Sequence, residues 1–209
     1  PVKVREELFA KNDIKEKKYF VYVGTVEPRK NLINIIKGFD CYCYQNDIKD
    51  TALIIAGGKG WNCENIYAQK EKSINKDKIY FTGYISVEEK YALYKAAIAG
   101  IMASYYEGFG IPVLEAMSMG CIEIITNISS LPEVGGEAAI YIDNPDDYEA
   151  IANQLSKVAS LSDDERNGMV QKGYNQCDKF SWEKCTKEMV EQFIKIPRTP
   201  VLKNQNLIC

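Results

Sequence analysis

Short apolar runs alternate with amphipathic stretches along most of the chain. Six runs rich in β-branched and aromatic residues, two of them ended by glycine, predict β-strands. They cover residues 19–24, 52–58, 78–85, 99–104, 121–126 and 138–143. The run "ALIIAGG" is apolar throughout, which is typical of a strand that is buried on both faces of a parallel sheet.

The stretches between these runs have the spacing of amphipathic helices. Residues 31–46 place apolar side chains at every third or fourth position, namely Ile33, Ile36, Phe39 and Cys43. Ser86 and Glu89 form a capping box that opens a helix to about residue 97. Pro112 suits the first turn of a helix that ends at Gly120. After residue 145 the pattern is helical to about residue 195, with Ser162 and Ser181 as helix caps.

Strands that alternate with helices predict an α/β fold, a Rossmann-like parallel sheet with helices on both faces. Ligands of such sheets bind at the carboxyl ends of the strands. Five loops follow predicted strands: "GTVEPRKN", "GGKGWN", "TGYIS", "SYYEGFGIP" and "TNISSLPEVGG". We therefore expect all five loops on one rim of the sheet.

Composition removes several kinds of chemistry. The 209 residues carry a net charge of −3 and include no histidine, so histidine-dependent nucleophiles, bases and metal sites are excluded. The sequence also has no Cys-x-x-Cys and no Asp-x-Asp, so we expect no metal and no cofactor. The mild negative charge argues against a nucleic-acid partner. Carboxylates, lysine, arginine and backbone dipoles must carry any reaction.

The basic loop "GTVEPRKN" places two cations at the start of a predicted helix. Arg29 offers a fork of donors and Lys30 a point charge, and a helix N-terminus adds free N–H groups. Together they suit a diphosphate. The alternative is a solvated pair of surface cations.

The stretch "YYEGFGIPVLEAMSMG" sets two glutamates on either side of a glycine-broken loop. Glu107 and Glu115 could form an acid/base pair, contact one ligand from two sides, or be ordinary charges, Glu107 exposed and Glu115 favouring the helix dipole. Gly108 and Gly110 let the backbone approach a ligand. A helix start at Pro112 would leave the next N–H groups, those of Val113 and Leu114, without intrahelical partners.

Three segments together carry a family resemblance: "VGTVEPRKNL", "EGFGIPVLEAMSMG" and "SSLPEVGGEAAIYID". Over residues 19–193 the chain resembles the C-terminal, nucleotide-sugar-binding domain of family 4 (group 1) retaining glycosyltransferases of GT-B fold. The resemblance implies a hexosyltransferase with a nucleotide-sugar donor and a glycan or lipid-linked acceptor. The "EPRKN" variant is similar to a subgroup rich in mannosyl- and rhamnosyltransferases, which favours GDP-mannose and leaves a UDP-sugar open.

The resemblance also implies roles for individual residues. Arg29 and Lys30 would stabilise the departing diphosphate, and Glu107 would contact the donor hexose, so these three are the candidate catalytic residues. Many members have arginine where this chain has Thr25, so that duty passes to Arg29. Glu115 would bind the ribose. The full set of implied donor contacts is Gly24, Thr25, Gly83, Tyr84, Ile85, Gly108, Phe109, Gly110, Ile111, Val113 and Glu115.

In this family a second Rossmann-like domain holds the acceptor and precedes the donor domain. We therefore interpret residues 1–18 as an interdomain linker remnant, 19–195 as the donor domain and 196–209 as a C-terminal tail that is extended or disordered. The acceptor domain would lie in the same or a separate chain. We expect the isolated chain to bind nucleotide without robust sugar transfer.

We expect a cytoplasmic protein, with peripheral contact to the inner membrane made through the acceptor domain. Two other functions remain open at this point. One is a non-catalytic sugar-nucleotide-binding module on the same fold. The other is a glycoside hydrolase that uses the two glutamates, although the basic loop would then have no role.

Overall fold

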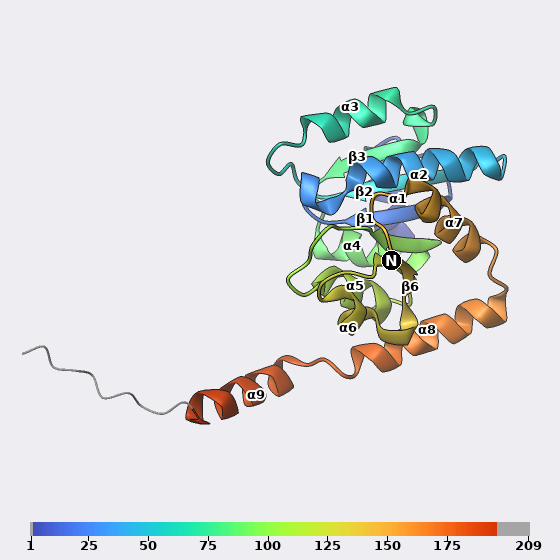
Figure 1. Ribbon diagram of the computed structural model, residues 1–209. Helices are drawn as coiled ribbons and strands as arrows, with labels where there is room; N and C mark the ends of the chain where they lie inside the picture. The colour runs from blue at the N-terminus through green and yellow to red at the C-terminus, as the bar shows by residue number, and fades with distance from the viewer. Residues whose placement is uncertain (1, 196–209) are drawn as a thin grey trace, which may run out of the picture. The chain divides into compact units, whose positions relative to one another are not determined.

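The computed structural model describes residues 2–195 (Figure 1). The chain divides into two compact units, Pro1–Cys177 and Asp178–Cys209. The first unit contains a six-stranded sheet and its covering helices, whereas the described part of the second contains one helix. The predicted C-terminal tail, residues 196–209, lies outside the described residues.

All six strands are parallel, in the order β3-β2-β1-β4-β5-β6. Each predicted run overlaps one strand, and the Rossmann-like parallel sheet is confirmed. The order reverses between β1 and β4, which makes their carboxyl ends the topological switch point. The strands are β1 (Lys18–Val23), β2 (Thr51–Ala56), β3 (Ile79–Gly83), β4 (Ala99–Met102), β5 (Glu123–Thr126) and β6 (Ile140–Ile142).

Helices connect the strands and cover both faces. In the first unit they are α1 (Val2–Lys11), α2 (Leu32–Gln45), α3 (Glu64–Lys72), α4 (Val87–Ala96), α5 (Ile111–Ser118), α6 (Leu131–Gly135), α7 (Tyr148–Ala159) and α8 (Asp163–Cys177). Short 3-10 turns occupy η1 (Pro28–Lys30), η2 (Lys76–Lys78) and η3 (Gly136–Ala138). None of the helices in residues 2–195 is long and apolar enough to cross a bilayer.

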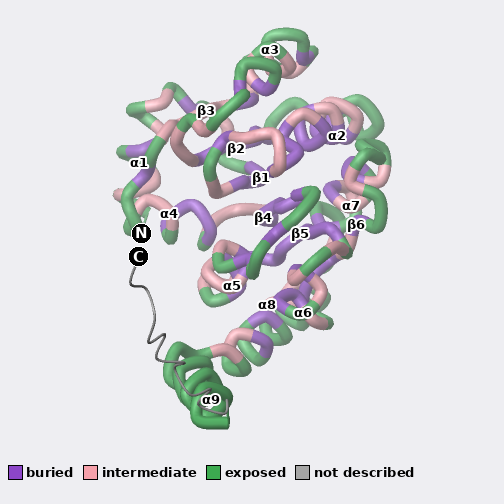
Figure 2. Tube along the Cα trace, turned by 60° about the vertical axis from the view of Figure 1, so that its left-hand side comes forward, coloured by how far each residue is buried: buried purple, intermediate pink, exposed green. Residues whose placement is uncertain are grey.

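The pleat of β1 shows how the strands are buried on both sides. Phe20 and Tyr22 face a core shared with α2, α3 and α7. Tyr19 and Val21 face a second core shared with α1, α4 and α5. Figure 2 shows buried residues along the strands and the inward sides of helices such as α2. Each fully buried large side chain contributes roughly 1.5–3 kcal/mol relative to exposure.

Capping confirms two of the predicted helix starts. Ser86 and Glu89 exchange the reciprocal bonds of a capping box at α4, and Ser162 does the same with Glu165 at α8. Helix α5 begins at Ile111, one residue before the predicted start. A five-residue helix, α6, and the η3 turn occupy the segment between β5 and β6.

Helices α1 and α3 have no counterpart among the predicted elements. Each buries only one residue, Leu8 in α1 and Ile66 in α3, so neither shows a clear apolar period. Leu8 nevertheless packs into the core beside α4, and the Phe9 ring meets Tyr19 at 5.4 Å between ring centres. Residues 2–11 are thus a packed helix rather than extended chain, while their origin as an interdomain linker stays a prediction.

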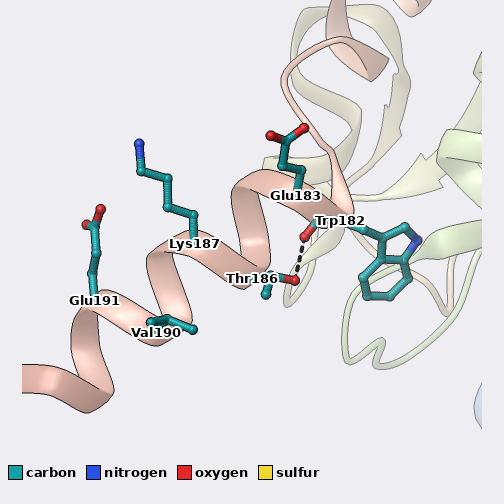
Figure 3. A pocket seen from close by; sticks show the side chains of 6 residues that line it. All are labelled: Trp182, Glu183, Thr186, Lys187, Val190 and Glu191. Carbon is teal, nitrogen blue, oxygen red and sulfur yellow. Dashed lines mark hydrogen bonds between the residues drawn. The ribbon is translucent and has the colours of Figure 1, made fainter.

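The second unit contains helix α9 (Trp182–Lys195). Its predicted cap is confirmed, since the Lys184 N–H donates to the Ser181 hydroxyl at 3.1 Å. No described residue of α9 is buried. Figure 3 shows Trp182 and Val190 on the opposite side of the helix from Lys187 and its acidic neighbours. The described helix therefore carries an apolar face.

Candidate functional site

A buried ion pair joins the loop after β1 to the loop after β4. The Lys30 ammonium lies 2.6 Å from Oε1 of Glu107, and the Ser104 hydroxyl donates to the same oxygen at 2.7 Å. Lys30 and Glu107 are each 7% exposed. The alternative of an exposed Glu107 is therefore wrong, because its carboxylate is buried against Lys30 and Ser104.

Arg29 completes the cluster from its more exposed side. Its Nη1 donates to Oε2 of Glu107 at 3.1 Å and to the Tyr106 carbonyl at 2.5 Å. Its Nη2 donates to Oε1 of Glu27 at 2.7 Å. The side chain of Arg29 is 37% exposed, so it is the cation of this pair that an incoming ligand reaches first. Lys30 is buried, and Arg29 is partly exposed but paired with Glu107 and Glu27, so the two are not a solvated pair.

The cluster shifts the ionisation of its members. Burial by itself would raise the pKa of the Glu107 carboxyl, but hydrogen bonds from Lys30 and Ser104 hold that pKa below its ordinary value. Burial would lower the pKa of Arg29, yet the bonds to Glu107 and Glu27 raise it. At neutral pH Glu107 is therefore a carboxylate and Arg29 a cation.

The Asn31 side chain and one main-chain hydrogen bond connect the loop after β1 to the loop after β4. Asn31 adopts a left-handed conformation with φ of 59°, and its side-chain amide donates to the carbonyls of Ala103 and Pro145. The Tyr105 N–H donates to the Arg29 carbonyl at 2.9 Å. The positions of Arg29 and Lys30 relative to Glu107 thus follow from the Asn31 side chain and one main-chain bond at the switch point.

The loop after β2 supports the loop after β1. Gly57 has φ of 154°, and a Cβ there would lie 1.9 Å from the Gly24 carbonyl oxygen, so only glycine allows this approach. The indole N–H of Trp61 donates to Oε2 of Glu27 at 3.1 Å. Tyr22 donates its hydroxyl to the Thr25 carbonyl at 2.8 Å. Gly24 and Thr25 therefore lie in the predicted loop, held by backbone contacts.

The loop before α5 is shaped by glycine and serine. Gly110 has φ of 106°, and a Cβ there would lie 2.8 Å from Leu131. The Ser130 hydroxyl donates to the carbonyls of Glu107 and Phe109, which turns these carbonyls toward Ser130. A Cβ at Gly108 would meet no atom within 4 Å. Backbone beside Gly108 is therefore open to a ligand.

One expected donor at the start of α5 is already used. The Val113 N–H donates to the Gly110 carbonyl at 3.0 Å, and Val113 is fully buried. The prediction that this N–H is free for a ligand is wrong, because the helix starts one residue earlier than we inferred. Ile111 is 49% exposed and lies at the accessible end of α5.

Glu115 lies on α5 and is held by the neighbouring helix. The Lys90 ammonium of α4 lies 2.5 Å from Oε1 of Glu115, and both side chains are partly exposed. At the end of β3, Gly83 has φ of 69°. Tyr84 follows with 84% of its surface exposed, whereas Ile85 is buried. Tyr84 is thus the accessible ring of that predicted base-binding loop.

Sequence reasoning missed four side chains that complete the site: Glu27, Trp61, Lys90 and Ser104. Glu27 stands two positions before Arg29 in the basic loop, so its charge was a usable signal. The other three come from different elements, and only the fold brings them to their partners. No group of three or more metal-ligating side chains comes together within residues 2–195.

The family profile for "Glycosyl transferases group 1" matches residues 4–176. This chain belongs to the group 1 glycosyltransferases. Among curated relatives, it is similar to O-antigen chain mannosyltransferase B of Escherichia coli, with 35% identity over 176 residues. An O-antigen chain mannosyltransferase of Salmonella typhimurium is 31% identical over 157 residues. These matches cover 84% and 73% of this glycosyltransferase chain but 45% and 43% of the relatives.

Solved structures confirm the GT-B type of fold. A UDP-forming α,α-trehalose-phosphate synthase from Burkholderia vietnamiensis superposes with a TM-score of 0.81 at 12% identity. A trehalose-6-phosphate protein of Escherichia coli, bound with UDP-2-fluoro glucose, superposes with a TM-score of 0.80 at 11% identity. Each alignment covers 94% of this glycosyltransferase chain and 48% of the other chain. The chain thus spans about half the length of the proteins it matches, or less.

Proposed function

We propose that this glycosyltransferase chain binds a nucleotide-diphosphate sugar for retaining transfer to a glycan or lipid-linked acceptor. GDP-mannose is the favoured donor, because two similar curated proteins are mannosyltransferases by name. The observation that carries the proposal is the cluster of Arg29, Lys30 and Glu107 at the switch point of the sheet. That position is where open α/β sheets bind their ligands.

In the proposed reaction the bond between the sugar and the diphosphate breaks as negative charge grows on the phosphate. Arg29 and Lys30 stabilise that charge electrostatically, which lowers the barrier without a histidine or a metal ion. Glu107 orients the hexose and holds both cations in place until the donor arrives. With the acceptor domain supplied, transfer that continues in excess EDTA would support the metal-independent route, and loss of transfer that Mg²⁺ restores would contradict it.

Glu115 binds the ribose hydroxyls in this proposal, with the base near Gly83, Tyr84 and Ile85. The test is calorimetry with GDP, UDP, ADP and their sugars. Glu115→Ala is expected to weaken GDP binding but not binding of 2′,3′-dideoxy-GDP, because only the first ligand has the hydroxyls. Equal binding of GDP by wild type and by a Lys30→Ala/Glu115→Ala double variant, at a ligand concentration that saturates neither, would overturn the donor site.

The acceptor belongs to a second domain, in the same or a separate chain, in our proposal. The chain alone is then expected to bind nucleotide and to transfer little sugar. The test measures transfer from radiolabelled GDP-mannose to an O-antigen-type acceptor. It compares the chain alone with the chain plus the N-terminal half of a similar mannosyltransferase. Robust transfer by the chain alone would contradict the two-domain proposal, while binding without transfer in either setting would favour a non-catalytic binding module. The cytoplasmic location, with peripheral contact to a membrane, stays a prediction.

A further inference from the structure

A groove of about 390 Å³ lies between the starts of α2 and α3 and the loop that follows β4. Its volume falls in the range of small-molecule sites. Its lining includes the apolar side chains of Pro28, Leu32 and Ile66, and the polar side chains of Asn62 and Asn65. None of the described residues that line it is charged. A phosphate or carboxylate would therefore find no charged side chain in the lining, whereas a neutral polar ligand fits.

The lining contains four asparagines, and they divide into two kinds. The amides of Asn31 and Asn34 are used by the fold: Asn31 bonds the carbonyls of neighbouring loops and Asn34 donates to Asn31 and Tyr105. The structure records no hydrogen bond within residues 2–195 for the side chains of Asn62 and Asn65, and both residues are exposed. Each offers two donors and an acceptor to a ligand.

One aromatic ring lines the groove, a second is next to Asn62 in the sequence, and both are held by hydrogen bonds. Tyr105 lines the groove, and its hydroxyl donates to Asp146 at 2.6 Å. Trp61 precedes Asn62, is 61% exposed, and is anchored through its indole N–H to Glu27. Amides that pair with hydroxyls, beside aromatic and aliphatic surface that packs on C–H groups, suit a sugar ring.

We propose that this groove binds a neutral sugar unit of the acceptor glycan. The inference rests on the proposed glycosyl transfer. The groove would add an acceptor contact on this domain, beside the cluster formed by Arg29, Lys30 and Glu107. The groove and that cluster share the η1 turn, because Pro28 lines the groove and Arg29 follows it. The main-chain bond from Tyr105 to Arg29 ties the opposite wall to the same turn.

The test is an NMR titration of the 209-residue chain with mannotriose, a neutral oligosaccharide. We expect saturable shifts of the side-chain amide signals of Asn62 and Asn65 and of the Trp61 indole signal. Asn62→Gly with Asn65→Ala is expected to weaken mannotriose binding by about fivefold or more, the loss of one to two hydrogen bonds. Glycine retains the left-handed conformation of Asn62, whose φ is 47°.

Asn153→Ala is the matched control, because Asn153 is an exposed asparagine on α7 away from the groove lining. It should leave the titration unchanged. The inference would be overturned if mannotriose shifted none of these signals in wild type. It would also be overturned if wild type and the double variant bound mannotriose equally well. Displacement of mannotriose by GDP would also overturn it, because the groove would then belong to the donor.

GDP binding by the groove variant separates this inference from the proposed function. We expect the double variant to bind GDP as wild type does, which also shows that it is folded. If GDP binds and mannotriose does not, only the groove assignment fails. If mannotriose binds at Asn62 and Asn65 but GDP does not bind, the donor proposal fails, and the groove remains a sugar site without its assigned reaction.

Discussion

The ammonium of Lys30 and the carboxylate of Glu107 meet at 2.6 Å, although 77 positions separate them in the chain. Their side chains are 9% and 8% exposed. Removing one partner of a buried pair leaves the other charge uncompensated, which costs about 3–5 kcal/mol. The pair therefore contributes to the fold as well as to the proposed chemistry.

Lys30→Met is expected to lower the free energy of unfolding by about 3 kcal/mol, because Glu107 then keeps only Arg29 as a charged partner. Urea unfolding measures the change. Lys3→Met is the control, since the Lys3–Glu7 pair lies 3.9 Å apart at the surface and both side chains are mostly exposed. A loss in Lys30→Met no larger than in the control would contradict a stabilising role for the buried pair.

Combining Lys30→Met with Glu107→Gln should cost less than the sum of the two single changes. The double variant removes both charges, so no buried charge is left alone. A double-mutant cycle by urea unfolding gives the coupling energy directly. Strict additivity would show that the two side chains contribute independently.

Arg29→Lys is expected to weaken GDP binding about tenfold and to lower the stability of the fold. The two guanidinium nitrogens bond Glu107, Tyr106 and Glu27 together, and a lysine ammonium cannot reproduce that planar fork. Calorimetry gives the affinity and thermal unfolding the stability. Arg5→Lys, a change in helix α1, is the matched control. Unchanged GDP affinity in Arg29→Lys would show that only charge matters at this position.

Gly57→Ala should destabilise the chain by about 3 kcal/mol or more. Its added Cβ would lie 1.9 Å from the Gly24 carbonyl oxygen, and φ of 154° disfavours any side chain. The adjacent Gly58→Ala is the control, because a Cβ there meets nothing within 4 Å. Equal unfolding midpoints for the two variants would disprove the tight approach of the loops after β1 and β2.

Glu123 predicts a pH dependence of stability. This β5 residue is 3% exposed, and its Oε1 has no hydrogen-bond partner. Burial raises the pKa of its carboxyl well above the ordinary value. The folded chain thus keeps a proton that the unfolded chain releases, so this group's contribution to stability falls as pH rises above the unfolded pKa, up to the folded pKa. Within that window the slope is about 1.4 kcal/mol per pH unit.

Glu123→Gln removes this titration and keeps the shape of the side chain. Urea unfolding at pH 5, 6 and 7 is expected to show the variant gaining stability relative to wild type as pH rises. The neighbouring Tyr94 and Cys121 are buried with pKa values raised well above their ordinary ones, so neither adds a slope in this range. Parallel pH profiles for variant and wild type would contradict a protonated Glu123.

Much of the fold follows from local sequence. The strands bury both faces, so their apolar runs are continuous and visible, and Ser86 caps α4 with the predicted Glu89 partner. Helix α1 shows the limit. It packs through Leu8 against a surface that exists only once α4 has folded, so its own residues carry almost no periodic signal.

In the candidate site, too, the residues could be predicted from the sequence but their contacts could not. Arg29, Lys30 and Glu107 were predictable because the loops that follow parallel strands meet at one rim of the sheet. Their pairing was not, since it depends on how far each loop turns after its strand. The Lys90 contact with Glu115 joins two helices, and the used N–H of Val113 depends on a helix start one residue earlier than Pro112 indicates.

The main-chain bond between the Tyr105 N–H and the Arg29 carbonyl has a consequence for how this site can vary. It involves no side chain, so every residue except proline at position 105 can form it. This part of the link between the two loops can therefore be inherited unchanged while side chains other than Asn31 diversify. Attempts to redirect the site to another sugar are best aimed at those side chains, with the backbone frame left as a constant.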